Sequence, residues 1–407
     1  MHYIKIPPRP KMGESLRHMG YTTIYALADI LDNSLDAEAE KVNLYADSFG
    51  TQKEPVTVID VFDNGCGMTG PEIEEALTYG ANTNKSAHAL GCFGLGLKTA
   101  GTSIGRRIIV LSRTVGGVLE CRVYDLDANE QQGDFVVEKR SPTAEEATRF
   151  NEELGDYASG TWISLHKIDQ EEYKNVKTLL SALKSERNLR LIFRKFLASK
   201  KCSISVNGTE LVEFGYDYVE GIDILAGPLP FRLKDGTDLG SVKIISTADT
   251  TFTGKHGSSR PQGLVVVRNN RDITPKVSWK GILTNHWEYT GVYAIWEVTA
   301  QQFDSLMGTT VMKNDWNLPQ NVGDALKNLL NPHLMSHKKQ REKNRAAKPN
   351  SGVTIAEDVI KSYGNNLNNN MNITPKPKIR NVAKVSPPTR KAKSPHLSIT
   401  KKASPSG

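Results

Sequence analysis

The stretch Ile59–Ala100, IDVFDNGCGMTGPEIEEALTYGANTNKSAHALGCFGLGLKTA, decides the fold. It begins inside an apolar run, Val56–Phe62, whose β-branched residues predict a buried strand. The run ends at Asp63-Asn64-Gly65, a turn that is also typical of a hairpin. Two features favour a following helix instead, because Gly67 permits close backbone approach and Thr69–Glu72 reads as a helix start. The sequence therefore predicts a strand, a tight turn and a helix.

A second glycine-rich turn closes the stretch. Gly91–Ala100 (GCFGLGLKTA) has three glycines followed by good helix formers. The unpaired N–H groups and the positive dipole end of such a helix face the loop and favour an anion. The turn is not a Walker A loop, because Leu97 separates Gly96 from Lys98. It is also a poor dinucleotide fingerprint, because no strand directly precedes it. The turn predicts a phosphate site of another kind.

Length and composition set the class of protein. A chain of 407 residues predicts two or three domains. No apolar run approaches the roughly 18 residues of a membrane span, and nothing near the start resembles a signal peptide, so a soluble protein without a membrane partner is expected. The four cysteines are dispersed, without metal-type spacing or a disulfide framework. A cytoplasmic location is expected, with a nucleoid-associated or nuclear location as the alternatives.

Positive charge gathers at the end of the chain. Lys338–Gly407 holds 16 Lys and Arg against 3 acidic residues, a net charge of +13 that exceeds the +7 of the whole chain. From about residue 346 the composition is too polar to bury a core, which predicts a disordered basic tail over 346–407. Such tails favour polyanions, so we expect sequence-independent DNA binding through phosphate contacts. The alternatives are a solubilising extension and a tail that docks an acidic protein.

The segment Tyr21–Ala37 has the 3.6-residue apolar period of a core-facing helix. Asp29, Asn33 and Asp36 fall together on the opposite side, in a narrow polar stripe that we expect to be covered. A solvated helix face is the alternative. Asp29 and Asn33 are four residues apart and project in the same direction. This pair suits a water-activating base beside a magnesium ligand.

Three short motifs occur in order along the chain: Asp29-x-x-x-Asn33, Asp63-x-Gly65-x-Gly67 and Gly91-x-x-Gly94-x-Gly96. Together they resemble the nucleotide-binding boxes of the GHKL ATPases, the superfamily of gyrase B, the large heat-shock chaperone, histidine kinases and MutL. The resemblance implies an α/β Bergerat fold, in which helices cover one face of a mixed sheet and hold ATP with Mg²⁺.

The resemblance also implies a role for each motif. Asp29 would activate water, Asn33 would hold Mg²⁺, and Asp63 would accept a hydrogen bond from the adenine amino group. Thr161 resembles the threonine of a strand that closes the adenine pocket, although a buried strand threonine explains it equally well. The other implied nucleotide-binding residues shape the base pocket, the lid (Asn82–Ala89) and the phosphate loop (Gly91–Lys98): Gly65, Gly67, Met68, Asn82, Gly91, Phe93, Gly94, Leu95, Gly96, Leu97 and Lys98.

One position departs from the family pattern. Members that hydrolyse ATP usually have glutamate where this chain has Asp29. The shorter side chain stands further from a water placed for glutamate, and such a misplacement costs about 100-fold in rate. Slow hydrolysis is therefore expected, unless the helix lies closer to the nucleotide.

The second half of the chain predicts another α/β domain. Glu171–Ser199 reads as one long helix whose basic second half we expect to be solvated. Lys201–Val206 and the hairpin signal Asn207-Gly208 then open new strands. Gly263–Thr274 and Val311–Trp316 resemble the strand-turn and the lysine loop of the transducer domain in MORC-type ATPases. The resemblance implies that Lys313 reaches the γ-phosphate, whereas an inert exposed lysine is the alternative.

These inferences give four predicted parts. They are an ATPase domain with an N-terminal arm (1–168), a connecting helix (169–200), a transducer-like domain with a terminal helix (201–345) and the disordered tail (346–407). The expected function is a Mg²⁺-dependent ATPase that forms a homodimer on ATP binding and closes as a clamp on DNA. A chaperone-like or regulatory ATPase acting on protein partners is the alternative.

Overall fold

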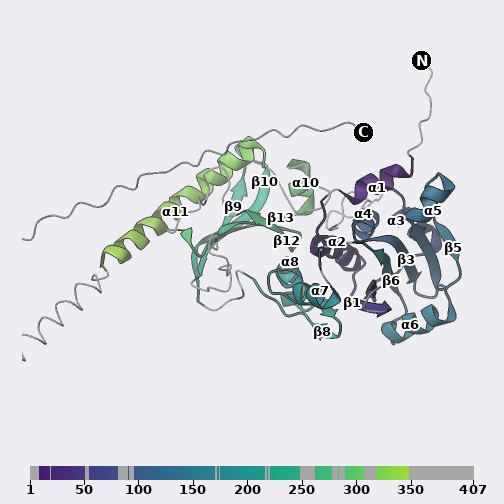
Figure 1. Cartoon of the computed structure of the whole chain (residues 1–407). Coiled ribbons are helices and arrows are strands. Elements are labelled where there is room, and N and C mark those ends of the chain that lie inside the picture. The colour runs from purple at the N-terminus through teal and green to yellow at the C-terminus, as the bar shows by residue number, and fades with distance from the viewer. Residues whose placement is uncertain are drawn as a thin grey trace, which may run out of the picture. The chain divides into compact units, whose positions relative to one another are not determined.

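The computed structural model of the chain describes residues 9–18, 20–50, 55–80, 90, 96–169, 172–173, 175–215, 218, 221–247, 262–276, 283, 289–306 and 318–347. The chain divides into two units, Met1–Arg345 and Ala346–Gly407, and the first contains two β-sheets with their helices (Figure 1). Over the described ranges, no helix is both long and apolar enough to cross a membrane.

The first sheet has eight strands in the order β5-β4-β3-β6-β2-β1-β7-β8. Neighbouring strands are antiparallel except β1 and β7, which are parallel. This mixed sheet with its helices confirms the predicted α/β class. The strands are β1 (Lys41–Gly50), β2 (Pro55–Asp63), β3 (Gly105–Arg113), β4 (Glu120–Asp125), β5 (Glu138–Arg140), β6 (Gly160–Ile168), β7 (Ser203–Val206) and β8 (Thr209–Glu210).

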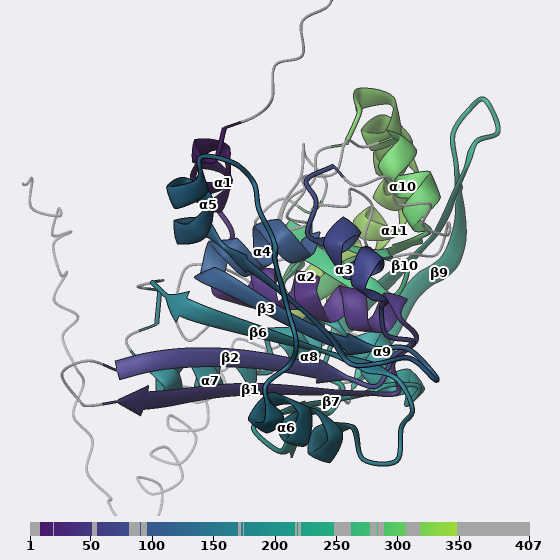
Figure 2. The ribbon, with the colours of Figure 1, turned by 90° about the vertical axis from the view of Figure 1, so that its right-hand side faces the viewer.

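Helices cover both faces of this sheet, so the one-sided arrangement that the resemblance implied is wrong. In β2, Val61 joins the core that α2 contributes to through Leu27, whereas its neighbour Phe62 stacks on Trp162 near α6. The alternation follows from the two-residue period of a strand. Figure 2 shows the strands between α6 and the pair α2 and α4. The helices here are α1 (Lys11–Arg17), α2 (Thr23–Asp36), α3 (Gly70–Ala76), α4 (Gly96–Ile104), α5 (Leu126–Gln132) and α6 (Ala144–Leu154).

The two predicted helix starts are confirmed. The Thr22 side chain caps α2 by accepting a hydrogen bond from the Tyr25 amide. Thr69 and Glu72 form a capping box at the start of α3, where the Glu72 carboxylate accepts a hydrogen bond from the Thr69 amide at 2.7 Å. The chain therefore leaves β2 through a turn into a helix and does not form a hairpin there.

The second sheet has five strands in the order β12-β11-β13-β10-β9, with β11 and β13 parallel. One face packs on α10 and α11, where Trp296, Phe303 and Leu326 share a core. The opposite face packs against Leu191 of α8 (Leu189–Ile192). The elements are β9 (Ile222–Arg232), β10 (Asp238–Thr247), β11 (Gly263–Arg268), β12 (Arg271–Lys276), β13 (Val292–Val298), α10 (Ala300–Leu306) and α11 (Gln320–Ala347).

The single connecting helix predicted over 169–200 is wrong. Three short helices replace it: α7 (Val176–Leu183), α8 (Leu189–Ile192) and α9 (Arg194–Ser199). The run is interrupted over residues 184–188, where Asn188 has a non-helical backbone (φ −109°, ψ −117°) and its side-chain amide donates to the Ala182 carbonyl at 2.7 Å, and again at Phe193. Asparagine often competes in this way with backbone hydrogen bonding inside a helix.

The predicted start of the second domain at residue 201 also needs correction. The hairpin at Asn207-Gly208 is present, and both residues have positive φ, 44° and 70°. However, β7 pairs with β1 and not with the second sheet. Ile204 and Val206 are buried in the core of the first sheet, so hydrophobic burial fixes this pairing.

The N-terminal arm contains a helix. Helix α1 packs near α4, and its Arg17 is buried, donating a 2.7 Å hydrogen bond to the Thr102 carbonyl and pairing with Asp169. The described part of the arm is thus attached to the first sheet's own helices.

Candidate nucleotide-binding site

Helix α2 presents the first motif on a covered polar stripe, as the sequence predicts. The Asp29 carboxylate is only 2% exposed. Its Oδ2 accepts a 2.7 Å hydrogen bond from the Tyr21 hydroxyl, and Arg271 Nη2 lies 3.3 Å from its Oδ1. Both oxygens of the predicted base are therefore fixed by neighbouring side chains.

Asn33 lies one turn further along α2. Its Nδ2 donates to the Asp29 backbone carbonyl at 3.2 Å, which leaves Oδ1 as the amide atom that suits a cation. No group of three or more His, Cys, Asp or Glu in the described ranges is arranged to hold a metal ion. A magnesium ion at Asn33 would accordingly take its other oxygen ligands from phosphate and water, as this ion commonly does.

Asp63, at the end of β2, is held between α2 and the following turn. Its Oδ2 accepts a hydrogen bond from the Ser34 hydroxyl at 2.9 Å, and its Oδ1 accepts one from the Gly65 amide at 3.0 Å. Burial raises the pKa of this carboxyl to about 6, although both hydrogen bonds favour the ionised form. The side chain is thus fixed in place and is ionised at neutral pH.

The two glycines after Asp63 are required by close packing. A Cβ atom on Gly65 would lie 2.7 Å from the Ala37 carbonyl oxygen, and one on Gly67 would lie 2.0 Å from the Arg113 carbonyl oxygen. Gly67 also has a φ of 72°, which side-chain-bearing residues rarely adopt. The predicted base-pocket turn is therefore pressed against the end of α2 and the end of β3.

Thr161 lies directly opposite Asp63 on the neighbouring strand β6. Its Oγ1 is 2.9 Å from the Ser112 hydroxyl, which also accepts a hydrogen bond from the Met68 amide at 2.8 Å. Ser112 thus links two predicted residues on two elements. Sequence reasoning missed both Ser112 and Ser34. The available signal was that each serine lies within an apolar segment that the sequence predicts to be a buried helix or strand.

Lys98, which the sequence predicted to bind phosphate, has its amine among three aromatic rings. Its Nζ lies 3.6 Å from the ring centroid of Tyr79, 4.2 Å from that of Tyr124 and 5.2 Å from that of Phe135. Burial lowers the pKa of this amine to about 7. The amine would have to leave these rings to contact a phosphate. Its neighbour Leu97 is buried in the core, and Gly96 starts α4 with open space beside it.

Six predicted residues lie outside the described residues: Asn82, Gly91, Phe93, Gly94, Leu95 and Lys313. Leu90 immediately precedes the glycine turn and is described. Its amide donates to Asp36 Oδ1 at 2.7 Å, and its carbonyl accepts from Arg268 Nη1 at 3.0 Å. Asp36, the third member of the polar stripe, therefore anchors the chain at the entry to the predicted phosphate loop.

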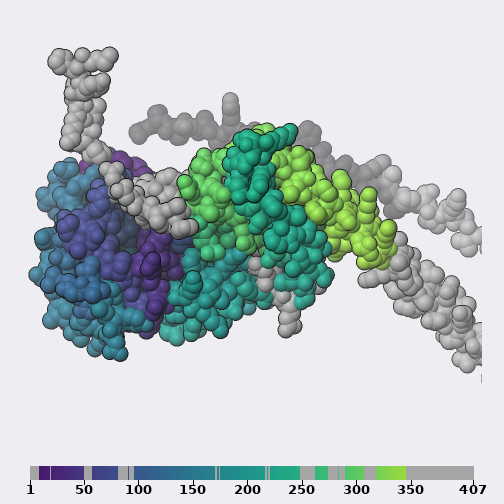
Figure 3. Space-filling view, turned by 180° about the vertical axis from the view of Figure 1, so that it is seen from behind, coloured from purple at the N-terminus to yellow at the C-terminus, as the bar shows by residue number. Residues whose placement is uncertain are grey.

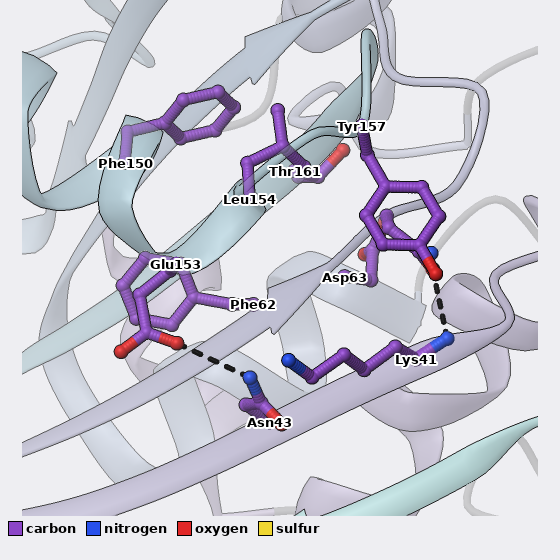
Figure 4. A pocket seen from close by; sticks show the side chains of 10 residues that line it. Lys41, Asn43, Phe62, Asp63, Phe150, Glu153, Leu154, Tyr157 and Thr161 are labelled. Atoms are coloured by element: carbon purple, nitrogen blue, oxygen red, sulfur yellow. Dashed lines mark hydrogen bonds between the residues drawn. The ribbon is translucent and has the colours of Figure 1, made fainter.

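A small cavity lies beside Asp63 and Thr161, toward α6 (Figure 4). Phe62, Phe150 and Tyr157 help to line it, and its volume of about 10 Å³ is roughly that of one water probe. This cavity is too small for a nucleotide base. The Asp63 carboxylate itself is directed toward α2, where it accepts the hydrogen bond from Ser34.

Comparisons with known proteins match this region. Residues 21–161 match the family described as "Histidine kinase-, DNA gyrase B-, and HSP90-like ATPase". The chain is 27% identical over 121 residues to ATPase morc-1 of Caenorhabditis elegans and 26% identical over 129 residues to ATPase MORC2B of Mus musculus. Each match covers 30% of this chain but only 13% and 12% of the two relatives, respectively.

Proposed function

Since residues 21–161 match the GHKL family and the chain is similar to MORC ATPases, we propose that it binds and slowly hydrolyses ATP with Mg²⁺. One observation carries the proposal. Helix α2 carries the buried carboxylate Asp29 and the amide Asn33, holds the buried Asp63 through the Ser34 hydroxyl, and packs against α4.

Each residue has a proposed task. Asp63 accepts a hydrogen bond from the adenine amino group, with Thr161 beside it, and Asn33 holds Mg²⁺ through Oδ1. A bound magnesium ion would neutralise phosphate charge. The glycine turn donates backbone N–H groups to the phosphates, and Lys313 reaches the γ-phosphate.

Asp29 is the proposed general base. Its carboxylate accepts a hydrogen bond from Tyr21 and lies beside Arg271, so its direction is fixed. The replacement of the family's usual glutamate by this shorter side chain supports slow turnover.

ATP-gated dimerisation is the next step that we propose. A non-hydrolysable ATP analogue with Mg²⁺ should double the molar mass measured by light scattering, because an ordered lid and Lys313 would complete a surface for a second copy. The same sample with Mg²⁺ alone is the control. A molar mass that stays constant on nucleotide addition would rule out the gated dimer.

DNA is the proposed substrate of the clamp, through the basic tail. Removing residues 346–407, or replacing their Lys and Arg with Gln, should weaken DNA binding and flatten its salt dependence, because the slope scales with the phosphates neutralised. ATP binding should be unaltered. An unchanged salt slope in the truncated chain argues against the tail. Turnover stimulated by unfolded protein and not by DNA would favour a chaperone-like ATPase.

A further inference from the structure

A tight hairpin of the second sheet reaches the ATPase motifs. Strands β11 and β12 are joined by Asn269 and Asn270, both with positive φ (48° and 65°), so Arg268 and Arg271 lie directly opposite each other. Both arginines are almost completely buried, at 1% and 0% exposure. Neither β11 nor β12 belongs to the sheet that carries the motifs.

Arg271 contacts two carboxylates of helix α2. Its Nε lies 2.9 Å and 2.8 Å from the two oxygens of Asp32, and its Nη2 lies 3.3 Å from Asp29 Oδ1. The Nη1 group is buried and has no hydrogen-bond partner among the described residues. The guanidinium therefore keeps one unused donor next to the proposed base.

The rest of the hairpin is fixed in the same region. Arg268 donates to the Leu90 carbonyl, at the entry to the glycine turn, and pairs with Asp304 of α10. Asp272 pairs with Arg194 of α9 at 2.7 Å. Arg194 belongs to the basic second half of Glu171–Ser199, and its burial makes the prediction that this half is solvated wrong in part. In Figure 3 the purple surface of the early chain borders the teal surface of the middle of the chain.

A buried ion pair by itself often adds little to the free energy of unfolding. Removing charges from water costs free energy that their attraction does not always recover, and apolar side chains often pack equally well. Arg271 instead fixes the orientation of the Asp29 carboxylate. With Tyr21 on Oδ2 and Arg271 on Oδ1, the plane of the carboxylate is set by two contacts from different parts of the chain.

We infer that Arg271 is a positioning residue for Asp29. Through this contact, the second sheet holds the Asp29 carboxylate in the orientation that a general base requires. The inference rests on the proposed ATPase function. When the β11–β12 hairpin lies against α2, the carboxylate is aligned; when it moves away, the carboxylate turns, and hydrolysis stops although ATP stays bound. Hydrolysis is in this way tied to the position of the second sheet.

The test compares Arg271→Gln, Arg271→Lys and the full wild-type chain for kcat, KM and affinity for a non-hydrolysable ATP analogue. Arg271→Gln should lower kcat by about 100-fold, the usual effect of a misplaced catalytic group, with KM and analogue affinity unchanged. Arg271→Lys should recover part of kcat, because one ammonium can still contact a carboxylate but cannot serve both as the planar fork does.

Arg122→Gln is the matched control. Arg122 is also about 1% exposed and also pairs with two carboxylates, Glu74 and Glu120, and it has no hydrogen bond or ion pair with any site residue that the structure describes. It should lower the melting temperature without lowering kcat. An Arg271→Gln variant that melts earlier but keeps or exceeds the wild-type kcat would overturn the inference.

Two further outcomes are decisive. If Arg271→Gln does not fold, Arg271→Lys carries the test, and a wild-type kcat in that variant would overturn the positioning role. Failure of the proposed function looks different, because the wild-type chain itself would then take up no ATP analogue.

Discussion

Replacing Asp63 with alanine is expected to weaken the uptake of ATP and ADP by about 10- to 150-fold. The substitution removes a charged acceptor from the adenine amino group, and a hydrogen bond to a charged group contributes about 1.5–3 kcal/mol. It also leaves the Ser34 hydroxyl and the Gly65 amide without their acceptor, so the pocket itself loses its shape. Titration calorimetry with Mg²⁺ present measures the effect directly.

Asp60→Ala is the control for this variant. Asp60 is a buried aspartate on the same strand, but it accepts hydrogen bonds from Trp162 and Ser164 and pairs with Arg149, on the α6 side of the sheet. Its loss should affect stability and not nucleotide affinity. Equal affinities of Asp63→Ala and wild type would disprove the proposed adenine contact.

The pKa of Asp63 adds a pH dependence to the same prediction. Because burial raises this pKa to about 6, the carboxyl is ionised above pH 6 and gains a proton below it. Protonation removes acceptor capacity, so affinity for the nucleotide should fall by up to about tenfold per pH unit below pH 6. Asp60→Ala should retain this fall, and Asp63→Ala should lack it.

Replacing Asp29 with asparagine is expected to remove most ATP turnover while leaving ATP uptake intact. The amide still fits beside the Tyr21 hydroxyl but cannot take a proton from water, and loss of a general base typically costs about 10²–10⁴-fold. Phosphate release from wild type and variant, each with and without DNA, gives the measurement.

The outcome separates two kinds of protein. Turnover in Asp29→Asn equal to that of wild type would exclude this carboxylate as the base. A wild-type chain that binds ATP but releases no phosphate would be a nucleotide switch without catalysis, in which Asp29 only helps to hold α2 against Arg271.

Local patterns predicted the core of the fold. The apolar run before Asp63 and the helix signals at Thr69 gave β2 and α3, and the period of residues 21–37 gave α2, because each depends on neighbours in the sequence. The single connecting helix was wrong in part for a local reason, because the Asn188 side chain competes with backbone hydrogen bonding between α7 and α8. The GHKL and MORC-like resemblance drawn from the motifs is confirmed by the comparisons.

Residues whose partners lie far along the chain could not be predicted. Arg271 is an ordinary charge in a hairpin until β12 brings it to α2, 242 positions from Asp29. Ser112 and Asp36 acquire their roles in the same way, through Met68 and Leu90. Lys98 illustrates the reverse case, because its place after the glycine turn suggested phosphate and the folded chain surrounds it with aromatic rings.

The parallel pairing of β1 with β7 sets the order in which the polypeptide can mature on the ribosome. Strand β1 emerges early, but its outer partner is translated about 160 residues later, since Asn43 pairs opposite Ser205. Until then the nascent chain carries an open strand edge, the kind of surface that recruits other chains. Completion of the first sheet therefore waits for residues 203–210, which lie just before the second sheet in the sequence.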